Sequence, residues 1–298
     1  MGPALFTIFI NDLVQHLDSN VLLFADDAKI FREISHVRDC EALQNSIDLL
    51  SVWCQMNEMS LNVSKCSVVT FTRSNNPIIH PYKLADQQLQ RSSKVKDLGI
   101  ILSPDLNPQE HINYICKKAN SALNFITRVS HDRFSVSALV TLYIHLVRPI
   151  LEFSSTVWNP YQSGQIARLE NTQSRFVRLV GLRLGMQYRA VPVHDLQLQL
   201  NLLPLSTRRE VNDVLFLKKL ITSSIDAPDL LLELDFRTSR SLRHTQLFAR
   251  RQYSTQYMYH SALPRLQRLA NNLPGQLDLF SMNNETFKKK LVSSLRSS

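Results

Sequence analysis

Two adjacent aspartates, Asp26 and Asp27, are the residues of this 298-residue chain whose type and setting best suit a chemical role. They lie between two short apolar runs, residues 21–24 and 28–31. Runs of this kind, rich in Val, Ile and Phe, predict buried strands, and short polar residues between them favour a tight turn. Burying two carboxylates together is costly, and a hard cation such as Mg²⁺ offsets that cost because it prefers carboxylate ligands. The pattern therefore predicts a metal-binding hairpin.

Two alternatives compete with the metal site. A bare Asp-Asp pair is most often an ordinary solvated turn. The pair would also suit the phosphoacceptor pocket of a doubly wound α/β receiver domain. That fold requires repeated strand–helix alternation, which the later chain does not show.

The elements that position the aspartates are predicted from apolar periodicity. Pro3 suits the first turn of a helix with a broad apolar face, which is expected to end near residues 18–20. After the acidic pair, Ser35 is expected to cap a second helix. The apolar stripe of this second helix follows a 3.6-residue period and comprises Leu43, Ile47, Leu50 and Cys54.

Further along the chain, strands are expected at residues 67–72 and 94–102. Gly99 within the second strand indicates close approach of another backbone or of a ligand. From Gln109 onward the apolar pattern is helical, and Arg148-Pro149 is expected to end one of these helices.

The segment from Gly2-Pro3, through the first predicted helix, to Phe24-Ala25-Asp26-Asp27 closely resembles the palm of reverse transcriptases from LINE-type (non-LTR, jockey-like) retrotransposons. In that family two Mg²⁺ ions organise attack of a primer 3′-hydroxyl on the nucleotide α-phosphate. The resemblance implies that Asp26 is the first metal ligand of the hairpin and that Asp27 assists or orients. It also implies a nucleotide and template site lined by Gly2, Pro3, Phe24 and Ala25.

Two later segments extend this resemblance. Leu61-Asn62 and Lys65-Cys66 match a family motif whose lysine is proposed to assist as pyrophosphate leaves, which implies that role for Lys65. A solvated lysine at a strand entry is the alternative. Residues 94–102 resemble the hairpin that grips the primer end, which implies primer-grip residues at Leu98, Gly99 and Ile100; an ordinary core strand is the alternative.

Residues 147–160, 169–176 and 202–209 resemble the thumb of the same elements. On a helical projection, Arg168, Arg175 and Arg178 lie opposite an apolar face, and a thumb would set them along the phosphates of the template–primer duplex. A solvated helix back is the alternative. Lys117 and Lys118 lie away from the apolar stripe of the preceding helix and are expected to bind nucleic acid as well.

The net charge is concentrated at the C-terminal end. Residues 239–298 carry ten Lys/Arg and two Asp/Glu, a net charge of +8, whereas residues 1–238 carry 24 and 23, a net charge of +1. This asymmetry indicates a polyanionic partner, and RNA template and DNA primer are the expected partners. The arginines there alternate with aromatic rings, which favours RNA; an ordinary basic helix pair with its rings packed inward is the alternative. The arginines are Arg240, Arg243, Arg250, Arg251, Arg265 and Arg268, and the rings are Phe248, Tyr253, Tyr257 and Tyr259.

The expected fold class is α+β. A partial polymerase palm of a few antiparallel strands with helices is expected over residues 1–107, a mainly helical thumb-like domain over 108–235, and a basic C-terminal extension over 236–298. The cysteines lack the spacing of zinc ligands and no apolar run reaches the length of a membrane span. We therefore expect no structural zinc, no membrane association and an intracellular location. The cysteines are Cys40, Cys54, Cys66 and Cys116.

The resemblance starts at the Gly-Pro, after the strand that carries the first catalytic aspartate in the family. We therefore expect that aspartate and the fingers to be missing, and weak or absent Mg²⁺ binding. Each missing ligand or donor costs a polymerase on the order of ~3 kcal/mol of transition-state stabilisation. The chain alone is thus expected to be inactive, and a non-catalytic nucleic-acid-binding remnant is the alternative function.

Overall fold

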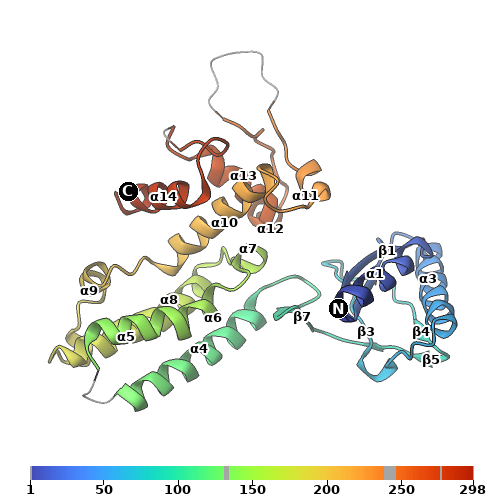
Figure 1. The fold of residues 1–298 in the computed structure, drawn as a ribbon, viewed down its shortest axis with the longest axis horizontal. Coiled ribbons are helices and arrows are strands. Elements are labelled where there is room, and N and C mark those ends of the chain that lie inside the picture. The colour runs from blue at the N-terminus through green and yellow to red at the C-terminus, as the bar shows by residue number, and fades with distance from the viewer. Residues whose placement is uncertain (1, 131–133, 238–245, 276, 298) are drawn as a thin grey trace. The chain divides into compact units, whose positions relative to one another are not determined.

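A computed structural model describes residues 2–130, 134–237, 246–275 and 277–297. The chain divides into two compact units, residues 1–107 and 108–298, and each is described by itself (Figure 1). Arg240 and Arg243 lie outside the described residues. Within the described part, helices are combined with a few short strands, so the expected α+β character is confirmed.

The first unit contains three α-helices and four two-stranded sheets among its described residues. The sheets pair β1 with β2, β3 with β6, β4 with β5 and β7 with β8. Three pairs are antiparallel, whereas β3 and β6 are parallel. The elements are α1 (Gly2–Ile10), α2 (Asp12–Gln15), β1 (Asn20–Phe24), β2 (Asp27–Phe31), α3 (Val37–Met56), η1 (Val63–Lys65), β3 (Ser67–Val68), β4 (Lys83–Leu84), β5 (Gln87–Gln88), β6 (Gln90–Arg91), β7 (Val95–Asp97) and β8 (Ile100–Leu102).

Helix α3 is the central packing element of this unit, because two apolar clusters form along it. One cluster joins Trp53 and Cys54 to α1, α2 and Leu23 of β1. The other joins Cys40 and Ile47 to Tyr82 and to Leu84 of β4. The 3.6-residue stripe predicted for this helix is therefore confirmed in part by burial of Ile47 and Cys54.

The N-terminal cap of α3 differs from the prediction. His36, and not Ser35, is the N-cap residue, and the Asp39 carboxylate accepts hydrogen bonds from the backbone N–H groups of Ser35 (2.9 Å) and His36 (2.8 Å). These hydrogen bonds stabilise the ionised carboxylate and lower the pKa of Asp39. The cap was misassigned by one residue because the capping-box carboxylate at the third helical position decides the helix start.

Two strand predictions are also wrong in extent. The strand expected at residues 67–72 is reduced to Ser67–Val68, because only these residues pair with β6. The strand expected at residues 94–102 is a hairpin, in which Leu98 and Gly99 form the turn between β7 and β8. Both turn residues have positive φ, +44° and +91°, as a type I′ hairpin turn requires.

The β1–β2 hairpin is less buried than its apolar sequence predicts. Leu23 packs against α1, α2 and α3, but the opposite face of the ribbon exposes Leu22, Phe24 and Phe31 to solvent. A two-stranded ribbon has two faces, and helices cover only one of them here. The expectation that both strands are buried is therefore wrong for the outward face.

The second unit is helical except for one isolated bridge between Phe236 and Phe248 among its described residues. Helices α4 and α8 lie side by side, and α10 crosses toward the C-terminal helices (Figure 1). The elements are α4 (Gln109–Ser130), α5 (Val136–Leu142), η3 (Tyr143–Val147), α6 (Arg148–Glu152), α7 (Ser155–Trp158), α8 (Ser163–Arg183), η4 (Tyr188–Ala190), α9 (Val193–Gln199), α10 (Leu205–Ile221), α11 (Pro228–Leu232), α12 (Gln256–His260), α13 (Ala262–Asn271) and α14 (Asn284–Ser297).

The apolar stripe predicted for α4 is confirmed. Residues spaced three, four and seven apart lie on one face of a helix, and that face is buried against α5, α6, η3 and α8. The buried residues of the stripe are Ile112, Ile115, Cys116, Ala119, Leu123 and Ile126.

Pro149 does not end a helix, contrary to the prediction. It occupies the first turn of α6, where its missing N–H costs nothing, and α6 continues to Glu152. The turn before it, Tyr143–Val147, is a π-helix, so the chain passes from α5 through η3 into α6 without a loop.

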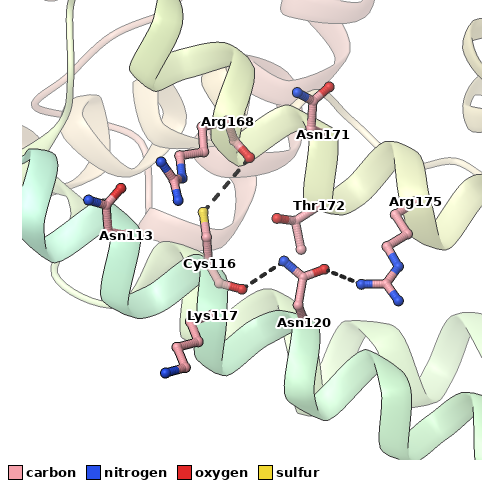
Figure 2. A pocket seen from close by; sticks show the side chains of 8 residues that line it. All are labelled: Asn113, Cys116, Lys117, Asn120, Arg168, Asn171, Thr172 and Arg175. Atoms are coloured by element: carbon pink, nitrogen blue, oxygen red, sulfur yellow. Dashed lines mark hydrogen bonds between the residues drawn. The ribbon is translucent and has the colours of Figure 1, made fainter.

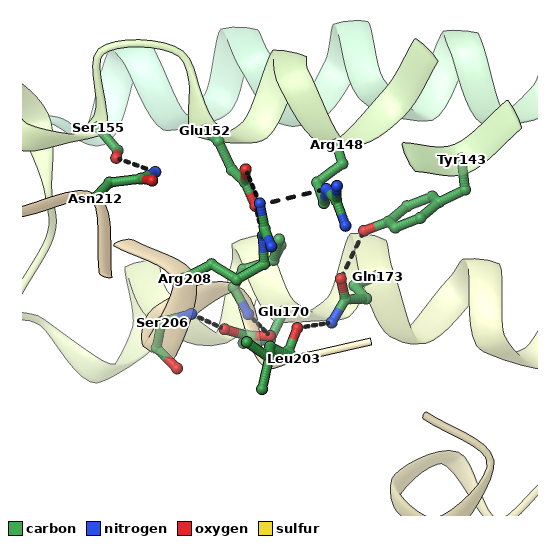
Figure 3. Close-up of polar contacts among 11 residues, drawn as sticks. Tyr143, Arg148, Glu152, Ser155, Glu170, Gln173, Leu203, Ser206, Arg208 and Asn212 are labelled. Carbon is green, nitrogen blue, oxygen red and sulfur yellow. Dashed lines mark hydrogen bonds and ion pairs between the residues drawn. The ribbon is translucent and has the colours of Figure 1, made fainter. Parts of the chain in front are cut away.

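Charged and polar side chains tie the helices of this unit together (Figure 3). The Glu152 carboxylate accepts hydrogen bonds from the Arg208 guanidinium, one of them 2.8 Å long at Nη2. The Glu170 carboxylate accepts hydrogen bonds from the backbone N–H groups of Leu205 (3.1 Å) and Ser206 (2.7 Å), the first residues of α10. A carboxylate at a helix N-terminus satisfies orphan donors and complements the helix dipole, so Glu170 fixes the start of α10 on α8.

The C-terminal helices share a core with α10. Phe287, Leu266 and Phe248 pack against Leu217 and Val214, and all five side chains are buried. Among the described residues, the basic C-terminal segment therefore packs as part of the helical unit.

Candidate metal hairpin and nucleic-acid groove

The acidic pair lies at the tip of the β1–β2 hairpin. Phe24 of β1 pairs with Asp27 of β2, which leaves Ala25 and Asp26 as a two-residue turn. Ala25 has φ +53°, a conformation that costs a residue with a side chain about 1–2 kcal/mol. The turn is thus shifted one residue from the predicted Asp-Asp turn. Asp26 projects from the turn, and Asp27 belongs to a strand face.

Strand alternation determines what surrounds Asp27. Side chains two residues apart share a face, so Asp27 lies on the outward face with Lys29 and opposite Phe24. Asp27 and Phe24 are exposed, and Phe24 retains 58% of its accessible surface. The outward face of the hairpin therefore combines carboxylates with an uncovered aromatic ring.

A salt bridge ties the β7–β8 hairpin to this face. Lys29 Nζ lies 2.5 Å from Asp97 Oδ1, and Asp97 directly precedes the Leu98-Gly99 turn. Leu98 is exposed, whereas Ile100 is buried in the fold. The structure thus joins the strand of Asp27 to the hairpin of the three predicted primer-grip residues through one ion pair.

The other predicted residues of this unit lie on separate elements. Gly2 and Pro3 form the exposed first turn of α1, and a β-carbon on Gly2 would meet no neighbouring atom. Lys65 ends η1 and is exposed, while its neighbours Val63 and Cys66 pack in the second α3 cluster. Among the described residues, no hydrogen bond or ion pair joins Lys65 to either aspartate of the hairpin.

The donor chemistry of the hairpin suits a hard cation. Asp26 and Asp27 offer carboxylate oxygens, which Mg²⁺ prefers, at an exposed turn that solvent reaches. In the part of the chain that the structure describes, no third His, Cys, Asp or Glu joins them in a group able to hold a metal ion. The hairpin alone therefore provides a partial ligand set.

A second candidate site lies between α4 and α8 in the helical unit (Figure 2). It is an open hollow of about 590 Å³, within the size range of ligand pockets. Three of its lining residues are cationic, and the lining includes no Asp or Glu. The residues of this α4–α8 groove are Asn113, Cys116, Lys117, Asn120, Arg168, Asn171, Thr172 and Arg175.

Amide side chains position one of these cations. Arg175 donates hydrogen bonds to Oδ1 of Asn120 (2.9 Å) and to Oδ1 of Asn124 (2.7 Å). Asn120 in turn donates to the backbone carbonyl of Cys116 (2.9 Å), as Figure 2 shows. Neutral amides hold the guanidinium without neutralising it, so the groove keeps its positive charge.

The floor of the groove is buried and chemically quiet. Cys116 lies against α8, and burial raises the pKa of its thiol. A thiol with a raised pKa is a poor nucleophile, so the cations and amides decide the chemistry of the groove. That chemistry suits an anion such as a phosphate, because guanidinium and ammonium groups are its usual partners.

The structure separates the predicted nucleic-acid-binding residues. Lys117, Arg168 and Arg175 line the groove, whereas Lys118 does not. Arg178 lies with its guanidinium carbon 5.8 Å from the ring centroid of Tyr188. Arg168 and Arg175 are exposed, as expected of residues opposite the apolar face of α8, and both line the groove between α4 and α8 (Figure 2). Their contact with duplex phosphates stays a prediction.

Two predicted residues of the C-terminal segment are exposed, Arg250 and Arg251. Arg251 forms an ion pair with Asp235, so part of its charge is neutralised within the protein. The three groove asparagines were not predicted. Two of them, Asn113 and Asn120, lie on α4, and their seven-residue spacing around Lys117 was the available signal.

Residues 1–102 match the family model of reverse transcriptase (RNA-dependent DNA polymerase). The chain is also similar to the RNA-directed DNA polymerases from mobile element jockey of Drosophila funebris (24% identical) and Drosophila melanogaster (22% identical). Each alignment covers 194 residues, 60% of this chain and 21% of the relative. The chain therefore resembles a jockey-like LINE reverse transcriptase and spans about a fifth of the length of these relatives. No solved structure matches it.

Proposed function

We propose that this chain supplies the acidic hairpin and a nucleic-acid-binding groove of an RNA-directed DNA polymerase of the non-LTR retrotransposon type. The observation that carries the proposal is the placement of Asp26 and Asp27 at the tip of an antiparallel hairpin, inside the segment that matches the reverse transcriptase model. Residues 1–107 then serve as part of a palm and the helical unit as a thumb. RNA template and DNA primer are the proposed partners.

Each part of the chain has a distinct task in this proposal. Asp26 and Asp27 would hold Mg²⁺, which supplies charge neutralisation for phosphoryl transfer. Phe24 and Ala25 flank the carboxylates and leave an open apolar surface for the nucleotide and template. Leu98 and Gly99 hold the primer end beside the hairpin, through the β7–β8 turn that the Lys29–Asp97 pair positions.

We infer that the chain alone is inactive as a polymerase. Two-metal nucleotidyl transfer needs carboxylates beyond the hairpin pair, because each ion requires several oxygen ligands. In a primer-extension assay with Mg²⁺, an RNA template and a DNA primer, we expect no incorporation by the purified chain. Template-dependent incorporation that Asp26→Ala abolishes would overturn the inactivity and keep the polymerase assignment.

Metal binding by the hairpin is tested apart from activity. Titration with Mn²⁺, followed by its electron paramagnetic resonance signal, should give weak binding that the double variant Asp26→Ala/Asp27→Ala removes. The β4–β5 hairpin offers a matched control, since Ala85-Asp86 also forms a two-residue turn between paired strands but Gln87 follows it. Asp86→Ala should leave Mn²⁺ binding unchanged. Binding that survives in the double variant would refute the metal role of the hairpin.

The α4–α8 groove supports a second candidate function, a nucleic-acid-binding remnant without chemistry. Its three cations without lining acids suit the phosphate backbone of an RNA–DNA duplex, independently of the hairpin. We expect Lys117→Gln to weaken duplex binding several-fold and to reduce the slope of log affinity against log salt by about 1.

The neighbouring Lys118→Gln is the matched control for this groove. It removes the same charge from the same helix outside the groove lining, so it should leave affinity and salt slope nearly unchanged. If the two variants weaken duplex binding equally, binding depends on the overall positive charge of the helix and not on the groove. Duplex affinity that does not respond to salt would exclude phosphate contacts altogether.

A further inference from the structure

Four aromatic rings of the helical unit contact one another in series. Tyr161 stacks on His260 with ring centroids 4.5 Å apart and an interplanar angle of 4°. Tyr259 meets the same histidine edge-on at 4.9 Å, and Tyr253 meets Tyr259 edge-on at 6.3 Å. Tyr161 lies just before α8, whereas the other three belong to α12 or the residues before it. We call these residues the ring cluster.

Arg268 of α13 holds the centre of the ring cluster. Its guanidinium carbon lies 3.6 Å from the ring centroid of Tyr259, and it donates a hydrogen bond to the backbone carbonyl of the same residue. Tyr259 therefore has one face covered by a cation and an edge against His260. Tyr161 and Tyr259 are similarly exposed, 38% and 40%, but within the ring cluster Tyr161 contacts only the His260 ring, so Tyr161 is the better candidate for a further stacking partner.

Charge around the ring cluster favours an anionic chain. Arg265 and Arg251 are paired with Asp213 and Asp235. Arg268 and the exposed Arg250 form no ion pair with a carboxylate in the described parts of the chain. Burial, with two arginines nearby, lowers the pKa of His260, which keeps its ring neutral beside Tyr161. A stacked ring pair close to Arg268, whose charge no carboxylate pairs with in the described parts of the chain, has the composition of single-strand-binding surfaces.

We propose that the ring cluster is a binding site for unpaired bases of a single-stranded nucleic acid, and that Tyr161 is its stacking platform. A base on the open face of Tyr161 adds a third plane to the Tyr161–His260 stack. Bases in a duplex are already stacked and cannot reach it, so the site selects unpaired strands. Tyr259 and Arg268 act as positioning residues that hold His260 behind Tyr161.

This site goes beyond the proposed function, because it is independent of the metal hairpin and of the duplex groove. It lies close to that groove along the chain. Tyr161 lies two residues before Ser163, the first residue of α8, and Arg168 follows Ser163 by about 8 Å of helix rise, estimated from 1.5 Å per residue. A single-stranded extension of a duplex held in the groove can therefore reach the ring cluster within a few nucleotides.

The test uses the full chain and two probes, an unstructured oligo(U) RNA and a blunt RNA–DNA duplex. Fluorescence anisotropy should show that Tyr161→Leu weakens oligo(U) binding about tenfold, while Tyr161→Phe, which keeps the ring, binds like the unaltered protein. The salt slope should not change, because a ring contacts no phosphate. Duplex binding should change less than about twofold.

A control is Tyr188, a 47% exposed tyrosine of the same unit that lies outside the ring cluster and faces Arg178. Tyr188→Leu should leave oligo(U) affinity unchanged. If Tyr161→Leu binds oligo(U) as tightly as Tyr161→Phe, or if it weakens duplex and oligo(U) equally, the stacking platform is refuted.

Crosslinking gives a second measurement that does not depend on a folded variant. Oligonucleotides carrying 4-thiouridine, irradiated with the unaltered chain, should crosslink to peptides containing Tyr161 or His260. Crosslinks confined to other peptides would overturn the inference. Loss of duplex binding in Lys117→Gln with retained oligo(U) crosslinks would separate this site from the groove of the proposed function.

Discussion

Two hairpins of the first unit have turns of the same composition and opposite surroundings. Ala25-Asp26 connects β1 and β2, and Ala85-Asp86 connects β4 and β5. The residue before each turn is apolar, but Leu84 is 3% exposed whereas Phe24 is 58% exposed. The β4–β5 hairpin uses its apolar residue to stabilise the fold. The β1–β2 hairpin leaves its ring uncovered beside Asp27, as expected of a surface that binds something else.

The backbones of the two turns differ as well. Ala85 and Asp86 both have positive φ, as in a type I′ turn, whereas only Ala25 does in the first hairpin. The Gln44 side chain also holds β4 in place: it accepts a 2.9 Å hydrogen bond from the Lys83 N–H and donates one of 2.9 Å to the Lys83 carbonyl. An Ala-Asp turn is therefore a structural device that this fold uses twice. The β1–β2 hairpin differs from the β4–β5 hairpin in having Asp27 after its turn and a solvent-exposed outward face.

The largest expected effect is on stability, and it distinguishes Leu84 from Phe24, the apolar residues that precede the two turns. Leu84→Ala should lower the free energy of unfolding of the first unit by about 2–4 kcal/mol, because it removes buried methyl groups and leaves a cavity. Phe24→Ala should change it by less than about 0.5 kcal/mol. Urea unfolding followed by the fluorescence of Trp53, in a Trp158→Phe background, reports this unit. A large loss for Phe24→Ala would show that the ring is structural and break the comparison.

A smaller effect is expected from the side chain that brackets β4. Gln44→Leu should cost about 1–2 kcal/mol, since it leaves the backbone N–H and carbonyl of Lys83 without their partners. The control is Gln55→Leu, an exposed position on the same helix. The same unfolding measurement applies, and a Gln44→Leu variant as stable as the control would contradict the role of Gln44.

The Lys29–Asp97 ion pair, between the β1–β2 and β7–β8 hairpins, should contribute less to stability. Lys29→Met is expected to cost about 0.2–1 kcal/mol, because both side chains are partly exposed and salt screens them. A double-mutant cycle with Asp97→Asn gives the coupling energy, which should decline as salt is raised. A coupling energy of zero at low salt would mean that the pair does not position the β7–β8 turn.

The smallest effect concerns the turn backbones. Ala25→Gly and Ala85→Gly should each change stability by no more than about 1 kcal/mol, because relief of positive φ is offset by the greater freedom of glycine in the unfolded chain. Mn²⁺ affinity should stay constant in Ala85→Gly. A change in Mn²⁺ affinity for Ala25→Gly alone would indicate that the strained turn orients Asp26.

The sequence predicted helices better than strands, for a physical reason. The α4 stripe follows a local period, and its burial needed no knowledge of the partner helix. Strand pairing is non-local, so the shortening of the 67–72 strand depended on Gln90 and Arg91. The apolar pattern of residues 94–102 predicted one strand, because a Leu at positive φ is unusual and gives no turn signal. The hairpin at this place was implied only by the family resemblance.

The candidate sites also differ in whether local sequence or long-range packing forms them. The acidic pair was identified from adjacent residues, and its hairpin was correct except for the one-residue shift of the turn. The groove required the packing of α4 on α8, which no single helix encodes. Arg175 is exposed, as its position opposite the apolar face predicted, but its own helix does not show that Asn120 and Asn124 accept hydrogen bonds from its guanidinium.

The π-helical turn Tyr143–Val147 determines which side of the surrounding helix faces the core. The buried side chains there recur at every fourth residue, and an ideal α-helix would rotate such a series by about 120° over three steps. The extra residue in the π-helical turn cancels much of this rotation around the helix axis. The same side of the helix therefore faces the core both before and after Pro149. Deleting one residue of this turn would rotate Glu152 away from Arg208 and weaken the contact between α6 and α10. The buried series is Leu139, Tyr143, Val147 and Leu151.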